Sequence, residues 1–146
     1  MTRLRPKLGV DYTCRQAYPF EGPVIKDLYK GTLVENLDWD RPLDASWVMV
    51  VHPNKPEYYA CLSLVASQPI GRLEMLKVRA GLNRRLKASI VRDLVHYSLL
   101  VLKQYGCQAV TAFPEHDPSN TFQNVIQRRF KGQRLEQTCS AYITRF

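Results

Sequence analysis

The sequence predicts a single α/β domain over residues 1–146, with a mixed sheet of about six strands flanked by about four helices. Apolar runs of strand length alternate with segments whose apolar residues recur at helical spacing. The most regular helical segment lies between two apolar strands, and this order places those strands in parallel. With 146 residues, the chain is long enough to bury one core without disulfides or a metal.

The first part of the chain predicts one strand and two helices. We expect the strand at residues 8–16 and a helix that starts at Glu21-Gly22-Pro23, because proline is favoured in the first helical turn, where its missing N–H costs nothing. Gly31 ends or kinks this helix, and residues 33–39 predict a second, short one.

Residues 46–67 predict an antiparallel hairpin. The run at 47–51, Trp-Val-Met-Val-Val, is apolar throughout, which is typical of a buried strand. Two prolines and an asparagine at residues 52–56 stop strand pairing and predict a turn, and residues 58–67 supply the second strand. A third apolar strand is expected at residues 70–78.

The helix expected at residues 89–104 is the clearest element of the sequence. Its apolar residues recur at helical spacing, Ser89 can cap its first turn, and Gly106 stops it. A strand at residues 107–113 follows directly, which predicts a strand–helix–strand crossover and a parallel pair with the strand at 70–78.

The end of the chain predicts one more helix and one more strand. Asp117-Pro118 is a helix start with Asp117 as the cap, and Phe122 and Val125 lie on one side of that helix. Residues 135–146 alternate between apolar and polar side chains, as a closing strand would.

The composition is that of a soluble globular protein. The chain is 45% hydrophobic and 23% charged, and no apolar run approaches the roughly 20 residues that a membrane span requires. The basic tail at residues 1–8, with Arg3, Arg5 and Lys7, is not followed by the apolar stretch of a secretory signal. We expect a cytoplasmic protein without a membrane partner, or a virion protein if a phage encodes it.

The cysteines do not predict a metal site or a redox motif. The four of them are far apart in the sequence, without a Cys-x-x-Cys pair or a nearby histidine. Most lie in apolar, strand-like stretches, so we interpret them as small buried hydrophobic residues. These residues are Cys14, Cys61, Cys107 and Cys139.

The net charge of +8 is concentrated in three places, and it predicts an anionic partner. One cluster is the basic tail. Another lies between Lys77 and Arg92, where six residues are basic and none is acidic, and a third lies at residues 128–134. Charge alone does not distinguish nucleotide phosphates, nucleic acid and an acidic protein surface.

Three stretches of the sequence resemble the GNAT (N-acetyltransferase) superfamily. Residues 70–78 resemble its fourth strand, the basic stretch with the helix from Ser89 resembles its pyrophosphate-binding turn, and residues 120–130 resemble the helix whose start touches the cofactor. The resemblance implies one GNAT-like domain that binds acetyl-CoA and acetylates an amine. Few residues follow Phe130, so one of the two usual terminal strands is missing or very short.

The resemblance also implies where acetyl-CoA binds. In the superfamily, two diverging parallel strands admit the pantetheine arm, and N–H groups at the next helix start hold the pyrophosphate. A helix N-terminus attracts anions because its N–H groups are unpaired and its dipole is positive there. The residues implied as cofactor contacts are Leu76, Val78, Arg84, Arg85, Lys87, Ala88, Ser89 and Asn120.

The basic turn departs from the family pattern, which is Arg or Gln, two residues, Gly, one residue, then Gly or Ala. A frame starting at Arg84 places Lys87 and Ser89 at the small-residue positions, whereas a frame one residue earlier keeps Ala88 but has Leu86 at the first of them. Glycine lets a backbone approach phosphate without a Cβ in the way. A solvated basic loop is therefore the alternative interpretation of this stretch.

The catalytic groups are less well marked. Glu74, in the stretch that resembles the fourth strand, is the best candidate for the base that takes the proton of the amine. Its alternative role is a structural carboxylate paired with Arg72 or Lys77. Many GNAT enzymes use a tyrosine of the last helix as general acid, and residues 125–130 contain none.

Two other functions stay open at this stage. A GNAT-derived module without turnover could serve as a structural or docking subunit of a larger assembly, such as a phage particle. The basic charge also permits nucleic-acid binding, although the sequence has no helix-turn-helix signature, no zinc ligands and no basic stripe interleaved with aromatics.

Overall fold

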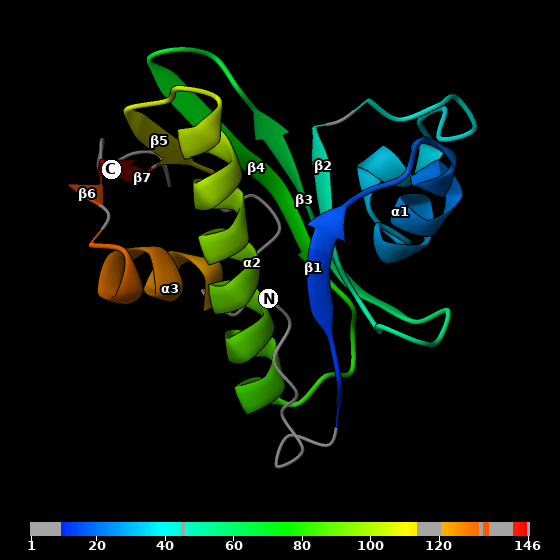
Figure 1. The fold of residues 1–146 in the computed structure, drawn as a ribbon. Coiled ribbons are helices and arrows are strands. Elements are labelled where there is room, and N and C mark those ends of the chain that lie inside the picture. Colours follow the sequence, from blue (N-terminus) through cyan, green and yellow to red (C-terminus); the bar gives the residue numbers. More distant parts are fainter. Residues whose placement is uncertain (1–9, 45, 114–120, 132, 135–141, 146) are drawn as a thin grey trace.

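The structure, a computed structural model, describes residues 10–44, 46–113, 121–131, 133–134 and 142–145 and is built on a seven-stranded mixed sheet (Figure 1). The strand order is β1-β2-β3-β4-β5-β7-β6, and β4 and β5 are the one parallel pair of neighbours among the described residues. The strands are β1 (Thr13–Gln16), β2 (Trp47–Val51), β3 (Tyr58–Val65), β4 (Ile70–Val78), β5 (Ala109–Ala112), β6 (Gln133–Arg134) and β7 (Tyr142–Arg145).

Helices cover both faces of the sheet (Figure 1). The long helix α2 (Arg84–Gln104) and α3 (Thr121–Arg129) lie on one face, and α1 (Gly22–Leu28) lies on the other. Two short 3-10 helices flank α1, at Pro19–Glu21 and Leu33–Asn36. Each face therefore has its own apolar core.

The strands at 47–51 and 70–78, the hairpin and the parallel crossover are confirmed by the structure. The sheet has seven strands instead of about six, because residues 133–134 pair with β7 as a very short strand. Three α-helices are described instead of about four. The helix expected at 33–39 is a single 3-10 turn, because the backbone of Leu37 is extended. The expected helix cap Asp117 lies outside the described residues, as does the basic tail at 1–8.

The start of α2 differs from the prediction. The helix begins at Arg84, not at Ser89, because the Asn83 side chain caps it by accepting a hydrogen bond of 2.8 Å from the Leu86 N–H. The prediction of Ser89 as the cap is wrong, since its hydroxyl lies 2.6 Å from that of Tyr12. The basic residues assigned to a loop therefore lie in the first turns of the helix.

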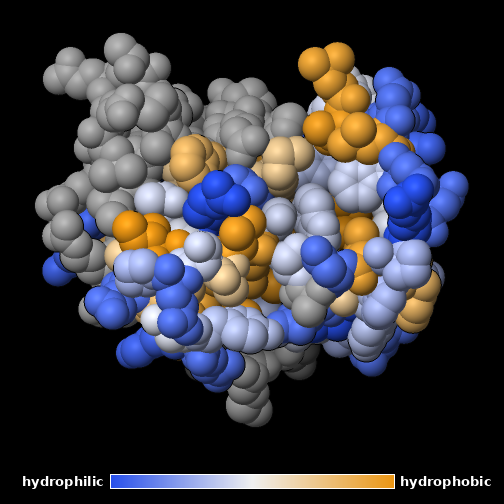
Figure 2. Space-filling view, turned by 90° about the horizontal axis from the view of Figure 1, so that it is seen from above, coloured by the Kyte–Doolittle hydropathy of each residue, from blue (hydrophilic) through white to orange (hydrophobic). Residues whose placement is uncertain are grey.

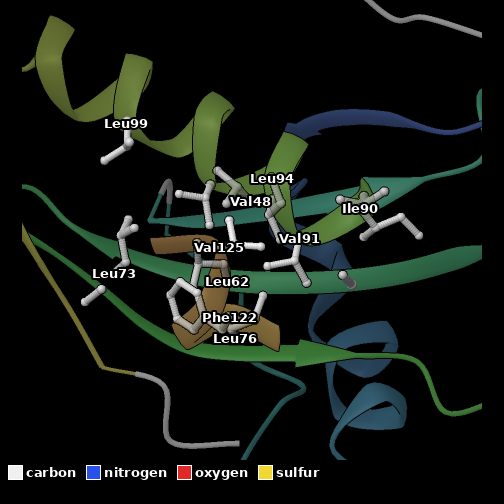
Figure 3. Packing of buried hydrophobic residues seen from close by; sticks show 14 of the residues in the cluster. Val48, Leu62, Leu73, Leu76, Ile90, Val91, Leu94, Leu99, Phe122 and Val125 are labelled. Atoms are coloured by element: carbon white, nitrogen blue, oxygen red, sulfur yellow. The ribbon is translucent and has the colours of Figure 1, made fainter. Parts of the chain in front are cut away.

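The larger core lies between the sheet, α2 and α3 (Figure 3). Phe122 of α3 is fully buried between α2 and the strands. Ile90, Val91 and Leu94, on the side of α2 that faces the sheet, are fully buried too. A fully buried side chain of this size contributes about 1.5–3 kcal/mol through the area it removes from water. The apolar side of α2 thus packs against the sheet and holds the helix in place there.

The smaller core lies under α1 and contains an aromatic group. Tyr29, Trp39 and Trp47 contact one another with ring centroids 5.7–6.4 Å apart. Cys61 is buried beside them, and burial raises the pKa of its thiol to about 12, so it is an apolar, protonated residue. Cys107 is buried as well, which confirms the interpretation from the sequence for these two cysteines; Cys139 lies outside the described residues.

At the end of the molecule that carries the C-terminus of α2, hydrophobic and hydrophilic side chains are interspersed (Figure 2). A small hollow of about 160 Å³ lies there, lined by Ser46, Leu64, Ala66, Val101, Leu102 and Tyr105. This end is opposite to the first turn of α2 (Figure 1).

A buried ion pair joins β1 to the start of α1. Arg15 donates two hydrogen bonds, of 2.6 and 2.8 Å, to the two oxygens of Glu21, whose side chain is only 2% exposed. The Tyr18 N–H donates to the same carboxylate at 2.7 Å. Burial raises the pKa of Glu21, but these hydrogen bonds outweigh it and hold the pKa below its usual range.

Replacing Glu21 with Gln should lower the free energy of unfolding by about 3 kcal/mol at neutral pH, because Arg15 is left partly buried without its counter-charge. A group whose pKa is lowered by folding stabilises the protein above its unfolded pKa, and this contribution is lost as the pH falls through the folded pKa. The difference between wild type and variant, measured by urea unfolding, should therefore shrink below pH 4. An equal loss in the exposed control Asp40→Asn, or a difference independent of pH, would contradict the assignment.

Candidate functional site

The parallel strands β4 and β5 separate in the middle of the sheet. They pair from Ile70 with Ala109 to Leu73 with Ala112, and the Phe113 N–H donates the next hydrogen bond to the Leu73 carbonyl at 2.9 Å. Beyond Leu73, β4 continues to Val78 and pairs there with β3 alone among the described residues. Among the described residues, those at 76–78 therefore have no strand partner on the side of β5, and we call this stretch the free edge of β4.

A β-bulge marks the place where the two strands part. Ser63 of β3 pairs with Glu74 and Cys61 pairs with Lys77, so Met75 and Leu76 together lie opposite a single residue of β3. Met75 has a φ of 63°, in the left-handed region that non-glycine residues rarely occupy. The bulge turns Met75 toward the core under α1 and Leu76 toward the core under α2.

Tyr29 holds this bulge from the α1 side of the sheet. Its ring is fully buried, and its hydroxyl donates a hydrogen bond to the Met75 carbonyl. A left-handed residue costs roughly 1 kcal/mol or more in backbone energy, so it persists only where the surroundings favour it. The contact thus links the end of α1 to the point at which β4 leaves β5.

A basic hollow of about 420 Å³ lies between the first turns of α2 and the facing side of α3. Of its described lining residues, four are Lys or Arg and none is Asp or Glu. The hollow is lined by Leu82, Arg84, Lys87, Ala88, Thr121, Asn124, Val125, Arg128 and Arg129. A concave surface whose described charges are all positive favours an anionic ligand. We call it the α2–α3 hollow.

The first turn of α2 adds backbone donors beside this hollow. The N–H groups at a helix start have no acceptor within the helix. Asn83 accepts two hydrogen bonds from this turn: its side chain accepts one from the Leu86 N–H, and its backbone carbonyl accepts one from the Lys87 N–H at 2.9 Å. Among the hydrogen bonds of the described residues, none uses the N–H of Arg84 or Arg85, so these two donors are available to an anion.

The structure brings together some of the residues expected to bind the cofactor. Arg84, Lys87 and Ala88 all line the α2–α3 hollow, whereas Arg85 is exposed and lies outside its lining. Ser89 is on the side of α2 that faces Tyr12. Asn120 lies outside the described residues, but Thr121, directly after it, lines the hollow.

Leu76 and Val78 do not line the hollow. Leu76 is 3% exposed in the core under α2, and Val78 packs against the same core. Both lie in the half of β4 whose edge is free of β5. Any ligand contact of these two residues would therefore come from their backbone.

Sequence reasoning missed Asn124, Arg128 and Arg129 as lining residues. Residues 121, 124, 125 and 128 recur at three- and four-residue spacing, so they share one face of α3, and Arg128 and Arg129 belong to the third basic cluster of the sequence. That spacing was the available signal. It did not identify α2 as the partner of this face.

The missing glycines of the basic turn do not crowd the hollow. Leu86, at the first glycine position in one reading frame, is 2% exposed and points into the core under α2. Ala88, at the second position of the same frame, lines the hollow and adds only a methyl group. In the frame that starts at Arg84, by contrast, the first glycine position is Lys87, which lines the hollow.

Glu74 lies on the α1 side of β4, directly opposite Ser63 and just before the bulge. It is half-buried and lines neither the α2–α3 hollow nor the second hollow described next. The expected alternative, an ion pair with Arg72 or Lys77, is not found among the described residues. Its role as a base stays a prediction.

A second hollow, of about 810 Å³, lies on the opposite face of β4, between that strand and α1. We call it the α1–β4 hollow. Lys77 and Arg79 of this stretch line it, while Leu76 and Val78 face the core under α2, as alternation along a strand requires. It is lined by Pro23, Val24, Asp27, Leu28, Lys30, Pro56, Glu57, Tyr58, Lys77, Arg79 and Ala80.

Solved structures of GNAT-family acetyltransferases share this architecture. An acetyltransferase of the GNAT family from Staphylococcus aureus matches with a TM-score of 0.69 at 10% sequence identity, over 92% of this chain and 98% of that one. A GNAT-family N-acetyltransferase from Escherichia coli in complex with CoA matches at 0.62 and 16% identity, over 92% and 81% of the two chains. A Mycobacterium tuberculosis protein in complex with CoA matches at 0.61 and 17%, over 85% and 73%.

These similarities show that the chain has the GNAT fold. The scan against protein-family models finds no match, and the search of curated proteins finds none either. In the part of the chain that the structure describes, no helix is long and apolar enough to cross a membrane. At identities of 10–17%, the structural likeness concerns the fold and not the activity.

Replacing Tyr29 with Phe should lower the free energy of unfolding by about 1–2 kcal/mol, because the Met75 carbonyl loses the hydroxyl that bonds to it. Thermal or urea unfolding measures the change. Tyr105→Phe is the matched control, since Tyr105 is 53% exposed and should lose almost nothing. Equal stability of the two variants would remove Tyr29 from its role at the bulge.

Proposed function

We propose that the protein binds acetyl-CoA and transfers its acetyl group to an amine. The observation that carries the proposal is the place of the α2–α3 hollow. It combines four cationic side chains with the open start of α2, and α2 follows directly from the strand that parts from its parallel neighbour. Two of the similar structures are complexes with CoA, which is consistent with this site in the same fold.

In the proposed complex, the pyrophosphate lies at the first turn of α2. Arg84 and Lys87 pair with its charges, the N–H groups of Arg84 and Arg85 donate to its oxygens, and Arg128 and Arg129 approach from α3. Ala88 leaves space beside the phosphates, and Asn120 stays a proposed contact at the start of α3. Ser89 has a weaker claim, because its hydroxyl already contacts Tyr12.

The pantetheine arm would follow the free edge of β4. Backbone groups of Leu76 and Val78 at this edge have no strand partner on the side of β5 among the described residues, so they can bond to the amides of the arm. The arm would carry the thioester to the bulge at Met75. This route uses the separation of the strands.

The proposed reaction is a direct transfer. The neutral amine nitrogen attacks the thioester carbonyl carbon, the C–N bond forms, and the C–S bond breaks. The nitrogen loses one proton to a base, for which Glu74 is the candidate, and the departing thiolate takes up one proton as free CoA. Thiols have pKa values near 8.5, so the thiolate can leave near neutral pH without a general acid. The absence of a tyrosine at 125–130 therefore does not prevent the reaction.

The two alternatives from the sequence make different predictions at the same site. A structural or docking module without turnover would not bind acetyl-CoA and would be found in a larger assembly in the source extract. A nucleic-acid-binding protein would bind DNA or RNA with an affinity that falls steeply as salt rises.

Isothermal titration with acetyl-CoA tests the proposal directly. Binding is expected, and Arg84→Ala and Arg128→Ala should each weaken it by about 10-fold or more, since a hydrogen bond to a charged group contributes about 1.5–3 kcal/mol. Lys103→Ala is the control, because it removes one positive charge from the far end of the same helix. No heat at millimolar acetyl-CoA would reject the proposed function.

The role of Glu74 is tested by turnover. Glu74→Gln should lower kcat by about 100-fold, because a positioned base contributes about 10²–10⁴-fold. Asp40→Asn, a conservative change at an exposed carboxylate outside both hollows, should leave kcat unchanged. An unaltered kcat in the Glu74 variant would assign proton removal to another group or to water.

A further inference from the structure

The α1–β4 hollow and the α2–α3 hollow lie on opposite faces of the sheet. At the end of β4, Lys77 and Arg79 line the α1–β4 hollow, while Leu76 and Val78 point to the core under α2. A single stretch of β4 therefore separates the two faces of the sheet. The free edge of this stretch is the edge that β5 leaves. A two-substrate transferase needs such an arrangement, because its two ligands must meet from different directions at one reacting carbon.

The charges of the α1–β4 hollow are unbalanced. Lys30, Lys77 and Arg79 supply three positive charges to its wall. Lys77 is half-buried, and neither it nor Arg79 forms an ion pair among the described residues. The wall also contains Asp27 and Glu57, so its cations exceed its carboxylates by one, and a half-buried cation without an ion pair favours an anionic ligand group.

The two acidic residues of the wall differ in whether they accept hydrogen bonds. Glu57 accepts a hydrogen bond of 2.8 Å from the Tyr59 hydroxyl, so it is already in use. No described residue donates a hydrogen bond to the carboxylate of Asp27, which lies on α1. Asp27 can therefore attract the protonated form of an incoming amine.

The rest of the wall is mainly apolar. Its apolar residues come from α1, from the turn before β3 and from the residue after Arg79, and they are Pro23, Val24, Leu28, Pro56 and Ala80. The volume of about 810 Å³ is within the usual range for a small-molecule site. Such a wall fits an apolar body beside the charged groups.

We propose that the α1–β4 hollow binds the acetyl acceptor, and that this acceptor is a small amino-carboxylate with an apolar side chain. Its carboxylate pairs with Lys77 and Arg79, and its amine is left free to reach the free edge of β4. This inference rests on the proposed acetyl transfer, because it names the acceptor of that reaction.

Binding of a product-like probe tests the hollow without any need for CoA. N-acetyl-L-phenylalanine carries the carboxylate, and N-acetyl-2-phenylethylamine is the same molecule without it. In isothermal titration, the first should bind at least 10-fold more tightly than the second. Lys77→Gln and Arg79→Gln should each remove most of this difference, whereas Lys26→Gln, on an exposed part of α1 outside the hollow, should leave it unchanged. Equal binding of the two probes, or no effect of either hollow variant, would overturn the inference.

Turnover separates this inference from the proposed function. With acetyl-CoA bound, kcat/KM for L-phenylalanine should exceed that for 2-phenylethylamine by at least 10-fold, and Lys77→Gln should reduce the ratio while the Kd of acetyl-CoA stays the same. Normal acetyl-CoA binding with a preference for the amine that lacks the carboxylate would overturn the inference about the acceptor alone. Probe binding in a protein that does not bind acetyl-CoA would reject the acetyl transfer and, with it, the acceptor role of the hollow.

Discussion

The separation of β4 from β5 is the constraint on which the rest of this site depends. Parallel pairing ends at Leu73 and Ala112, and the bulge at Met75 begins two residues later in β4. Among the described residues, those at 76–78 have no strand partner on the side of β5, and the side chains of this stretch face the core under α2 and the α1–β4 hollow in turn. Tyr29 reinforces the bulge through its bond to the Met75 carbonyl, so α1 stabilises the backbone at which the two proposed ligands would meet.

The connection from β4 to α2 turns this separation into an anion site. The segment between the two elements is short, and Gly81 adopts a φ of 86° within it. The helix therefore starts close to the end of the strand, with its unpaired N–H groups beside the α2–α3 hollow. The core under α2 fixes the helix in place, and Phe122 brings α3 and its basic face against it. Packing and electrostatics thus act at the same point.

Much of this fold could be predicted from the sequence, because its strands are apolar runs bounded by turns. The strands 47–51 and 70–78 are confirmed residue for residue, as is the parallel crossover. The start of α2 was misplaced because Arg84 and Arg85 carry no apolar periodicity, although Asn83 is a good cap. The bulge was not predicted, since it depends on the pairing of β4 with β3. Arg84, Lys87 and Ala88, predicted from the sequence as cofactor contacts, line the α2–α3 hollow, and that role stays a prediction. The side of the hollow formed by α3 was not predicted, because a contact between helices distant in the sequence leaves no local pattern. The α1–β4 hollow was not predicted either, because its lining comes from segments that are distant in the sequence.

In the proposed complex, the free edge of β4 and the first turn of α2 together receive CoA. Backbone amide shifts of ¹⁵N-labelled protein, recorded while CoA is added, test it most directly. The largest changes should fall on residues 75–78 and 84–88, while the amides at the C-terminal end of α2 stay unchanged. Changes confined to other parts of the sheet, with the amides of 75–78 and 84–88 unaffected at saturation, would contradict the account.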